Sequence, residues 1–514
     1  MQKSIFWTIG PAATRRPKLK TAKAITVLTL LSTVFMVLEC RDASAQTSRL
    51  ELGRRVRRLE QAWEVAKEEQ RTAALKPLKN AVASFFSLRL SEAGRNIDNA
   101  WLQLHGSELN STFELSLIGR TLLPVPLIGD TRVDEVKVRV AEFYESDQQP
   151  PEGTRLNLRL KLSTGKVVAE KSFVLTDDSE PVPWKTGSLP EGDHQILAEF
   201  QQENQKFPLP PITISRVKDL ESRLVALEDY LKTTKSKPQN QDHLGGATVS
   251  VDATVRNELA LFQQMVAGQS QEADFPVFAR LKFCEALVST SRRRGDFSEL
   301  LETNQQCWLT LTSKKRSIRT RIQLPDSRDR PLPVLFVFHG AGGSENMFFE
   351  NYGAGQVVRH ASERGWLVVS PGQGLFGMAL NIEEMLSSLS SFVECDRERV
   401  MLLGHSMGAM QVQTQFKLYP QLPIAAVAIG GGRRLTIDQG EQPSQTRWYV
   451  TAGADDFGRS GALQLYTSLK KTGIDAQYQE TSPAEHLTSV QASTPLIFEF
   501  LDKTLGAAER STSE

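Results

Sequence analysis

The sequence predicts an α/β fold in the C-terminal two-fifths of the chain, with a mostly parallel sheet and helices on both faces. Continuous apolar runs, such as residues 333–338 and 400–403, are typical of strands that are buried on both faces. The second run leads directly into a Gly-x-Ser-x-Gly sequence at 404–408, and a helical stretch follows. The length of 514 residues predicts further domains ahead of this one. There we expect helical segments and a small β-sandwich-like domain, because residues 136–140 and 156–162 alternate between apolar and polar side chains, as half-exposed strands do.

Apolar runs and amphipathic segments alternate along this part of the chain. The strands are expected near 317–324, 333–339, 365–370, 399–405, 424–430, 446–452 and 476–482. The helices are expected near 354–364, 380–394, 409–418, 461–471 and 491–504. Strands that alternate with helices in this way form parallel sheets with both faces covered.

The sequence Gly404–His405–Ser406–Met407–Gly408 stands between a predicted strand and a predicted helix. This context is what a nucleophile elbow needs, because the turn is so tight that its flanking positions tolerate almost no side chain. The serine then lies at a helix N-terminus, where backbone N–H groups point at developing negative charge. We therefore interpret Ser406 as a catalytic nucleophile.

A second glycine-rich loop, His339–Gly340–Ala341–Gly342–Gly343–Ser344, follows the strand at 333–338. Its glycines let the backbone approach a reacting carbonyl group. In a serine hydrolase, an N–H of this loop and the N–H of the residue after the nucleophile form the oxyanion hole. The pattern predicts the N–H groups of Ala341 and Met407 for this role.

An acid and a base follow in the order of a hydrolase triad. The strand at 446–452 ends in Gly453–Ala454–Asp455–Asp456, and His486 comes shortly after the last strand. The chain order is therefore Ser, Asp, His. His486 is expected to take the proton of Ser406 and to pass it to the leaving group, and one of the two aspartates is expected to orient the imidazole.

The stretch from about residue 316 to 505 resembles the α/β-hydrolase fold. More narrowly, it is similar to esterases related to polyhydroxybutyrate depolymerases and feruloyl or acetylxylan esterases. The segments that carry this resemblance are 332–334 with the loop 339–344, Trp366–Leu367–Val368–Val369–Ser370–Pro371, and 396–400 before the elbow.

The resemblance implies a carboxylic ester as the substrate. It also implies Asp456 as the triad acid, with Asp455 as the alternative, because the acid of that family commonly lies three residues after the glycine that ends its strand. His405 and Met407 flank the serine, where many depolymerase relatives carry smaller residues after it. This departure bears on the substrate more than on the fold.

Neither a cofactor nor a lid is expected. No His, Cys, Asp or Glu cluster has metal-ligand spacing, and no loop matches a phosphate cradle. The connection between Gly431 and Gln445 is short, although lid domains often enter near this point of the fold. By analogy, we expect an open, lidless site that suits a large or polymeric ester.

The 514 residues divide into seven predicted segments. They are a signal peptide (1–45), a helical N-terminal region (46–109), a β-sandwich-like domain (110–215), an amphipathic helix with a linker (216–250), a helical hairpin (251–312), the α/β-hydrolase domain (313–506) and a disordered tail (507–514). The linker composition predicts that residues 310–514 are an independent unit.

The first 45 residues predict export to the periplasm, the envelope or the medium. A basic region precedes an apolar core at 24–38, which is short for a membrane span, and Ala43–Ser44–Ala45 matches a cleavage site. Thr14–Arg15–Arg16 is close to a twin-arginine signal, so both the Sec and the Tat routes stay open.

The middle of the chain leaves alternatives open. The β-sandwich-like domain could contact glycan or another envelope component, or could serve as a spacer. Apolar residues at 3-4-3-4 spacing between Val217 and Leu231 fit either a dimerising helix or a helix packed on its own domain, so the oligomeric state stays open. Cys284 and Cys307 could form a disulfide across the predicted hairpin or stay reduced, and Cys395 is expected to be a buried free thiol.

Taken together, these features predict an exported serine esterase with a Ser–Asp–His triad. A serine peptidase or an acyltransferase would use the same triad. A non-catalytic envelope-binding protein with a degenerate hydrolase domain is the alternative from another class. The formal net charge of +1 gives no reason to expect nucleic-acid binding.

Overall fold

The structure is a computed structural model. It describes residues 43–106, 112–175, 180–235, 251–293, 295–313, 316–326, 331–373, 380–436 and 445–512. The predicted signal peptide and linker therefore lie almost entirely outside the described residues. Among the described helices, none is both long and apolar enough to cross a membrane.

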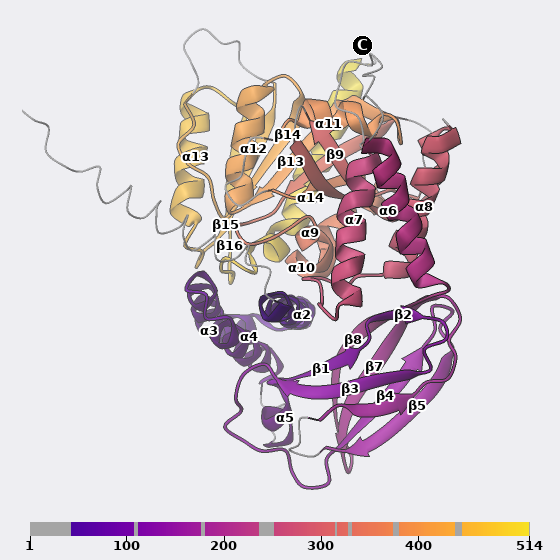
Figure 1. The fold of residues 1–514 in the computed structure, drawn as a ribbon. Helices are drawn as coiled ribbons and strands as arrows, with labels where there is room; N and C mark the ends of the chain where they lie inside the picture. Colours follow the sequence, from indigo (N-terminus) through magenta and orange to yellow (C-terminus); the bar gives the residue numbers. More distant parts are fainter. Residues whose placement is uncertain are drawn as a thin grey trace, which may run out of the picture. The chain divides into compact units, whose positions relative to one another are not determined.

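The described chain begins with helices, drawn in the dark colours of the N-terminal residues in Figure 1. They are α2 (Ala43–Val65), α3 (Glu68–Phe86), α4 (Leu90–His105) and α5 (Thr112–Leu117). The apolar stripe of α2 is buried at Leu52, Leu59 and Trp63. It shares one hydrophobic cluster with α3, α4 and the β-sheets that follow.

Two sheets form the β-sandwich-like part. One has the order β1-β3-β6 and the other β2-β8-β7-β4-β5. Their strands are β1 (Arg120–Val125), β2 (Ile128–Asp130), β3 (Glu135–Glu142), β4 (Arg155–Lys161), β5 (Val167–Val174), β6 (Val182–Lys185), β7 (Gly192–Gln202) and β8 (Gln205–Val217). All pairs are antiparallel except β2 with β8. Alternate residues of β4, namely Leu156, Leu158 and Leu160, are buried in the cluster shared with the helices.

The sheet of the C-terminal part has eight strands in the order β16-β15-β14-β13-β11-β12-β10-β9. They are β9 (Gln306–Ser313), β10 (Arg316–Gln323), β11 (Leu332–Phe338), β12 (Leu367–Pro371), β13 (Cys395–His405), β14 (Pro423–Ile429), β15 (Arg447–Gly453) and β16 (Ala476–Thr481). Strands β11 to β16 pair in parallel, whereas β10 is antiparallel to both β9 and β12.

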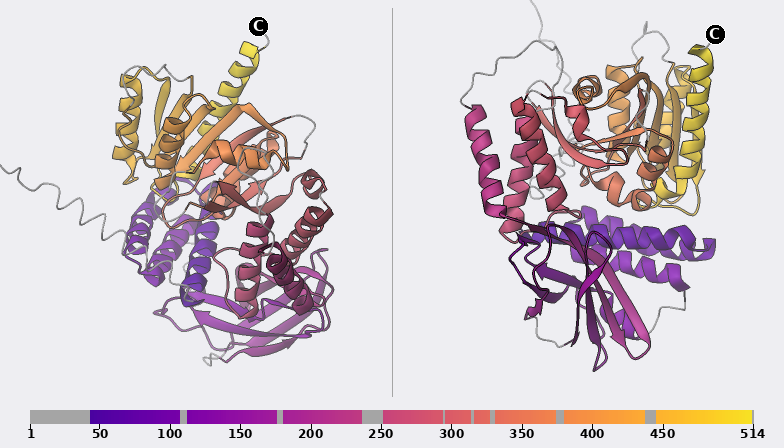
Figure 2. Two further views of the ribbon diagram at one scale, coloured as in Figure 1. Left: turned by 45° about the horizontal axis from the view of Figure 1, so that its top comes forward. Right: turned by 90° about the vertical axis from the view of Figure 1, so that its right-hand side faces the viewer.

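Helices cover both faces of this sheet (Figure 2). They are α9 (Met347–Glu350), α10 (Tyr352–Glu363), α11 (Ile382–Leu389), α12 (Met407–Leu418), α13 (Arg459–Lys471) and α14 (Ser489–Thr512). On β11, Phe336 and Phe338 pack in a cluster with α11, α12 and α13, whereas Leu335 and Val337 pack in another with α10 and α14. The predicted α/β fold with two covered faces is confirmed.

The predicted helical hairpin at 251–312 is wrong in its extent. Helices α7 (Val251–Val266) and α8 (Val277–Arg293) form the pair, with α6 (Leu220–Lys235) beside α7 and a short 3₁₀ helix η2 (Phe297–Leu300) after α8. Residues 306–313 are strand β9, on which Cys307, Leu309 and Leu311 are buried with the period of two that a strand requires. The α/β sheet thus begins at residue 306 and not at 313.

Two further predictions need correction, and one alternative that the sequence left open is decided. Leu281 and Leu287 of α8 belong to the same hydrophobic cluster as Phe336 of β11, so residues 310–514 are not a self-contained core. Helix α14 continues to Thr512, where a disordered tail from residue 507 was predicted. The heptad-like segment of α6 packs on its own chain, because Leu227 and Leu231 lie in this cluster too.

Of the two alternatives left open for Cys284 and Cys307, the structure has the reduced thiols. Cys284 on α8 and Cys307 on β9 are buried free thiols, as the alternative interpretation expected. The pairing failed because the second cysteine lies on a strand and not on the second helix of a hairpin. Burial in the apolar core raises the pKa of both thiols. Cys395 is free as well, but it is only partly buried.

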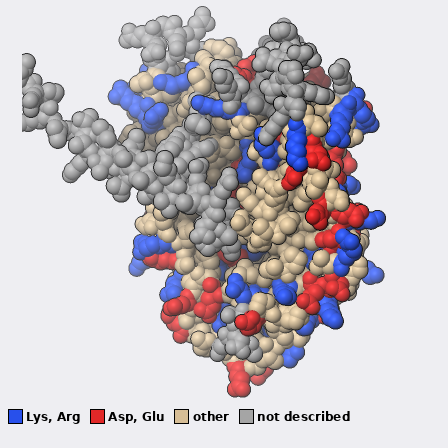
Figure 3. All heavy atoms as spheres, viewed as in Figure 1, with Lys and Arg blue, Asp and Glu red and all other residues tan. Residues whose placement is uncertain are grey.

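Basic and acidic side chains are interspersed on the face of the molecule drawn in Figure 3. Surface ion pairs include Arg223 with Glu285 at 2.6 Å and Arg364 with Asp502 at 2.9 Å. Opposite charges that are such close neighbours cancel within a Debye length, about 8–10 Å. These pairs therefore create no long-range field of one sign.

Candidate active site

The turn from β13 to α12 presents Ser406. Its backbone has φ 57° and ψ −115°, a left-handed conformation that costs energy in any residue with a Cβ. A Cβ on Gly404 would lie 2.2 Å from the carbonyl oxygen of Gly408, and a Cβ on Gly408 would lie 1.9 Å from that of Phe338. Only glycine fits at either position, which explains both glycines of the Gly-x-Ser-x-Gly sequence.

The structure brings Ser406, His486 and Asp456 together from three separate segments. The Ser406 hydroxyl lies 3.0 Å from Nε2 of His486, and Nδ1 of His486 lies 2.7 Å from Oδ1 of Asp456. An ionised carboxylate can only accept, so Nδ1–H donates to Asp456 and Nε2 is free to accept the hydroxyl proton. This arrangement can deprotonate a serine for attack on an electrophilic carbon.

Asp456 is held in the charged form. Its burial raises the pKa, but the hydrogen bond and charge of His486 outweigh this effect, so the pKa lies below its usual value. Gly458 N–H also donates to its carboxylate at 2.7 Å. The alternative acid, Asp455, turns away from the histidine and forms an ion pair with Lys79 of α3. Of the two aspartates, only Asp456 contacts His486.

The loop at 339–344 approaches the serine through Gly340, on which a Cβ would lie 3.3 Å from Cβ of Ser406. The Gly340 N–H donates to the Tyr352 hydroxyl at 3.1 Å. The Gly340 carbonyl accepts from Gly343 N–H at 3.2 Å and from Nδ1–H of His339 at 2.8 Å. The Ala341 N–H belongs to the same trans peptide as the Gly340 carbonyl and points in the opposite direction. The two groups that donate to this carbonyl therefore do not contact the Ala341 N–H.

His339 is a structural residue of this loop. Gln373 N–H donates to its Nε2 at 3.1 Å, which leaves Nδ1 as the protonated nitrogen that donates to Gly340. Burial lowers the pKa of His339 and keeps the ring neutral. Met407, the other predicted oxyanion residue, is the first residue of α12, where N–H groups have no partner within the helix.

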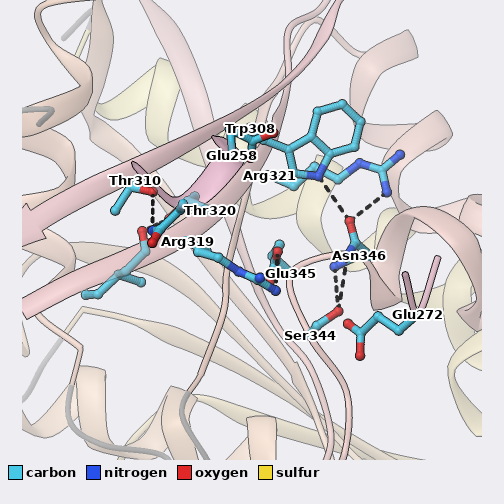
Figure 4. Close-up of polar contacts among 12 residues, drawn as sticks. Glu258, Glu272, Trp308, Thr310, Arg319, Thr320, Arg321, Ser344, Glu345 and Asn346 are labelled. Carbon is cyan, nitrogen blue, oxygen red and sulfur yellow. Dashed lines mark hydrogen bonds and ion pairs between the residues drawn. The ribbon is translucent and has the colours of Figure 1, made fainter. Parts of the chain in front are cut away.

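The end of the same loop is anchored to the outer strands of the sheet (Figure 4). Asn346 accepts from Trp308 of β9 and Arg321 of β10, both at 3.1 Å, and donates to Ser344. Arg319 forms an ion pair with Glu345 at 2.9 Å. The predicted hairpin segment around Trp308 therefore helps to position the loop.

The serine opens onto a cavity of about 790 Å³. Its lining includes Ser406, His486 and the loop at 340–344, but also residues far away in sequence: Arg49, Val56, Phe85, Phe86, Ile97 and Leu209. These come from α2, α3, α4 and β8. The expectation of an open site is therefore wrong, because the N-terminal helices wall the cavity. Most of the connection between Gly431 and Gln445, for which no lid was expected, lies outside the described residues.

Several residues at this site were not identified from the sequence. Arg49 donates to the carbonyl of Gly342 and pairs with Glu272 at 3.1 Å, and the Phe85 ring packs on Gly342. Phe457 contacts His486 with ring centroids 4.0 Å apart and ring planes tilted by 37°, and it is 61% exposed. No local pattern marks Arg49 or Phe85, because their role arises only from tertiary contact.

Glu485, next to the histidine, is a buried carboxyl group. It accepts from Leu487 N–H at 2.8 Å and Thr488 N–H at 3.1 Å, and so orders the turn from His486 into α14. Burial raises the pKa of Glu485 to about 8, and the charge of Asp456 acts in the same direction. The folded protein therefore keeps a proton there that the unfolded chain releases near its usual value of 4.5.

This difference predicts a pH-dependent stability. The contribution of Glu485 is lost as the pH rises from about 4.5 to about 8, because only the unfolded state gives up the proton without penalty. Thermal unfolding across this range should show a smaller drop in Tm for Glu485→Gln than for the wild type. Glu499→Gln, on an exposed part of α14, is the control and should drop like the wild type. An unchanged pH dependence in Glu485→Gln would contradict the assignment.

Residues 334–503 match the profile of the α/β hydrolase family. Among solved structures, a ferulic acid esterase aligns at 15% identity and a TM-score of 0.35, over 40% of this chain and 100% of its own. A fluorophosphonate-binding serine hydrolase of Staphylococcus aureus aligns at 15% identity and 0.32, over 39% and 98%. An S-formylglutathione hydrolase from Agrobacterium tumefaciens aligns at 16% identity and 0.32, over 41% and 99%.

The class of protein follows from the fold and the matched family. The C-terminal part of this chain is an α/β-hydrolase domain, as its eight-stranded sheet and the match over 334–503 show. No group of three His, Cys, Asp or Glu side chains is placed to hold a metal ion within the described parts of the chain.

Proposed function

We propose that this protein is an exported serine hydrolase that cleaves carboxylic esters through an acyl-enzyme. The observation that carries the proposal is the hydrogen-bonded series from the Ser406 hydroxyl through His486 to Asp456, with distances of 3.0 and 2.7 Å. The glycine-rich loop beside Ser406 supports it. The export part rests on the basic and apolar segments and the Ala-x-Ala sequence within residues 1–45.

In the first half of the reaction, Ser406 Oγ attacks the ester carbonyl carbon while Nε2 of His486 takes the hydroxyl proton. The N–H groups of Ala341 and Met407 stabilise the oxyanion, and Asp456 stabilises the imidazolium. His486 then gives the proton to the departing alcohol as the C–O bond breaks. Water, deprotonated by His486, attacks the acyl-enzyme, and His486 returns the proton to Ser406 Oγ as the acid leaves.

The cavity limits what can react. About 790 Å³ lies within the range of small-molecule sites. A polymeric ester therefore has to present an end or a side group that enters between the N-terminal helices and the loop at 340–344. The apolar side chains of Val56, Phe85 and Phe86 favour an apolar group next to the ester.

Labelling with a fluorophosphonate probe tests the nucleophile. The purified chain is expected to bind one probe, and mass spectrometry should place it on Ser406. His486→Gln should slow the labelling strongly, because the hydroxyl then has no base. A folded protein that takes no label would contradict the proposal and favour a non-catalytic binding protein.

Turnover separates the enzyme classes that share this chemistry. We expect hydrolysis of p-nitrophenyl acetate and butyrate, with slower or no cleavage of the corresponding p-nitroanilides. Faster cleavage of anilides would contradict an esterase and indicate a peptidase. Transfer of the acyl group to an added alcohol in preference to water would indicate an acyltransferase.

A further inference from the structure

A strained segment lies beside the active site at the start of α10. Four successive residues have positive φ: Tyr352 (55°), Gly353 (77°), Ala354 (51°) and Gly355 (82°). Two of these carry a Cβ, for which this backbone region is unfavourable. Such a conformation persists only where neighbouring groups hold it in place, and strain of this kind gathers at functional sites.

Two ionisable side chains hold this segment, one at its carbonyl groups and one at an N–H group. Arg359, further along α10, donates to the carbonyl groups of Ala354 and Gly353. Glu60, from α2, accepts from the Ala354 N–H at 2.9 Å. Carbonyl groups of the segment thus face the guanidinium group of Arg359, and an N–H group faces the carboxyl group of Glu60.

Glu60 reaches the hydrolase domain from a helix that is nearly 300 residues away in sequence. It is 1% exposed, and Gln491 of α14 donates to its backbone carbonyl at 2.9 Å. Burial raises the pKa of Glu60 to about 7, although the surrounding N–H groups lower it. An apolar residue would fill this position at a smaller desolvation cost, so simple packing does not explain a carboxyl group there.

The segment matters because Tyr352 connects it to the catalytic residues. The Tyr352 hydroxyl accepts from Gly340 N–H at 3.1 Å and lies 2.9 Å from Nδ1 of His405. His405 precedes Ser406, and its ring lies 4.5 Å from that of His486. A shift of Tyr352 would therefore change the position of the peptide that carries the Ala341 N–H. Glu60 would affect the active site in this way without contacting the substrate.

We propose that Glu60 of the N-terminal helix α2 is a positioning residue for the active site, which holds the segment 352–355 so that Tyr352 fixes the loop of the oxyanion hole. This inference rests on the proposed function. On this proposal, residues 46–65 contribute to the activity of the hydrolase domain and are not a separate N-terminal module.

Three variants test the proposal by p-nitrophenyl acetate turnover. Glu60→Ala should lower kcat about 10- to 100-fold with little change in KM, since a misplaced oxyanion donor costs up to about 10²–10³. Glu60→Gln keeps an oxygen that accepts from Ala354 N–H and should retain most of the activity. Glu64→Ala, on the exposed side of the same helix, is the matched control and should behave as the wild type.

Tyr352→Phe extends the test along the chain of contacts. It removes only the hydroxyl group, so it should reproduce the kcat loss of Glu60→Ala. If Glu60 acts through Tyr352, the double variant should be no slower than the slower single variant. Losses that multiply in the double variant would overturn the proposed route.

Hydrogen exchange tests this inference independently of the proposed function. The amides of residues 340–343 and 352–355 should exchange faster in Glu60→Ala than in the wild type and in Glu64→Ala. Unchanged exchange, or full activity in Glu60→Ala, would overturn the positioning role. A wild type without label or turnover would overturn the proposed function, and with it a role in catalysis, even if the exchange result were as expected.

Discussion

Replacing Ser406 by alanine is expected to lower kcat for p-nitrophenyl acetate about 10⁶-fold. The change removes the hydroxyl oxygen that lies 3.0 Å from Nε2 of His486 and that the proposed mechanism uses as the attacking group. Without it no acyl-enzyme forms, and the remaining rate comes from water attack next to the oxyanion donors. The KM of the residual activity should change little, because the cavity keeps its other walls.

The folding of this variant can be checked independently. Ser406 N–H donates to Ile429 of β14 at 2.8 Å, and alanine keeps this hydrogen bond. The thermal unfolding midpoint should therefore stay close to that of the wild type. A folded Ser406→Ala protein that retains more than a few per cent of the activity would place the nucleophile elsewhere.

Replacing Asp456 by asparagine is expected to lower kcat about 10⁴-fold. The amide nitrogen can donate to Nδ1 of His486, which favours the tautomer with its proton on Nε2. That nitrogen then cannot accept the Ser406 proton. Because the pKa of Asp456 lies below its usual value, the wild-type carboxylate stays charged through the neutral pH range.

The adjacent aspartate provides a matched control. Asp455 forms a partly exposed ion pair with Lys79, and such pairs contribute little. Asp455→Asn should change kcat less than about five-fold. Equal losses in the two variants would mean that the aspartates act together, and a larger loss in Asp455→Asn would contradict the assignment of the triad acid.

Local sequence patterns were sufficient to predict a feature where the residues of a single segment determine it. The apolar runs that became β11 and β13 are buried on both faces, and burial of both faces selects an unbroken apolar sequence. The serine at 406 was recognisable because the elbow admits only glycine at 404 and 408. Asp456 and Asp455 could not be separated by pattern alone, since both follow the same strand and only one turns toward His486.

Strand β9 shows how a local signal can still be misinterpreted. Cys307, Leu309 and Leu311 have the period of two that marks a strand, yet the segment follows a helix and was assigned to a hairpin. Its pairing with β10 lies at the edge of the sheet, where one neighbour suffices. The choice between strand and helix for a short segment depends on which partner is available, and that is a tertiary property.

The sequence by itself determined the α/β-hydrolase domain and the order of Ser406, an aspartate at 455 or 456, and His486, because burial and tight turns restrict the residues allowed at each position. Only the tertiary structure decided what surrounds them. The wall of α2 and α3 over the cavity, the buried Glu60 at residues 352–355 and the unpaired thiols of Cys284 and Cys307 all depend on contacts between distant segments. The identity of a single helical residue does not reveal such a contact, because the interaction energy depends on both partners.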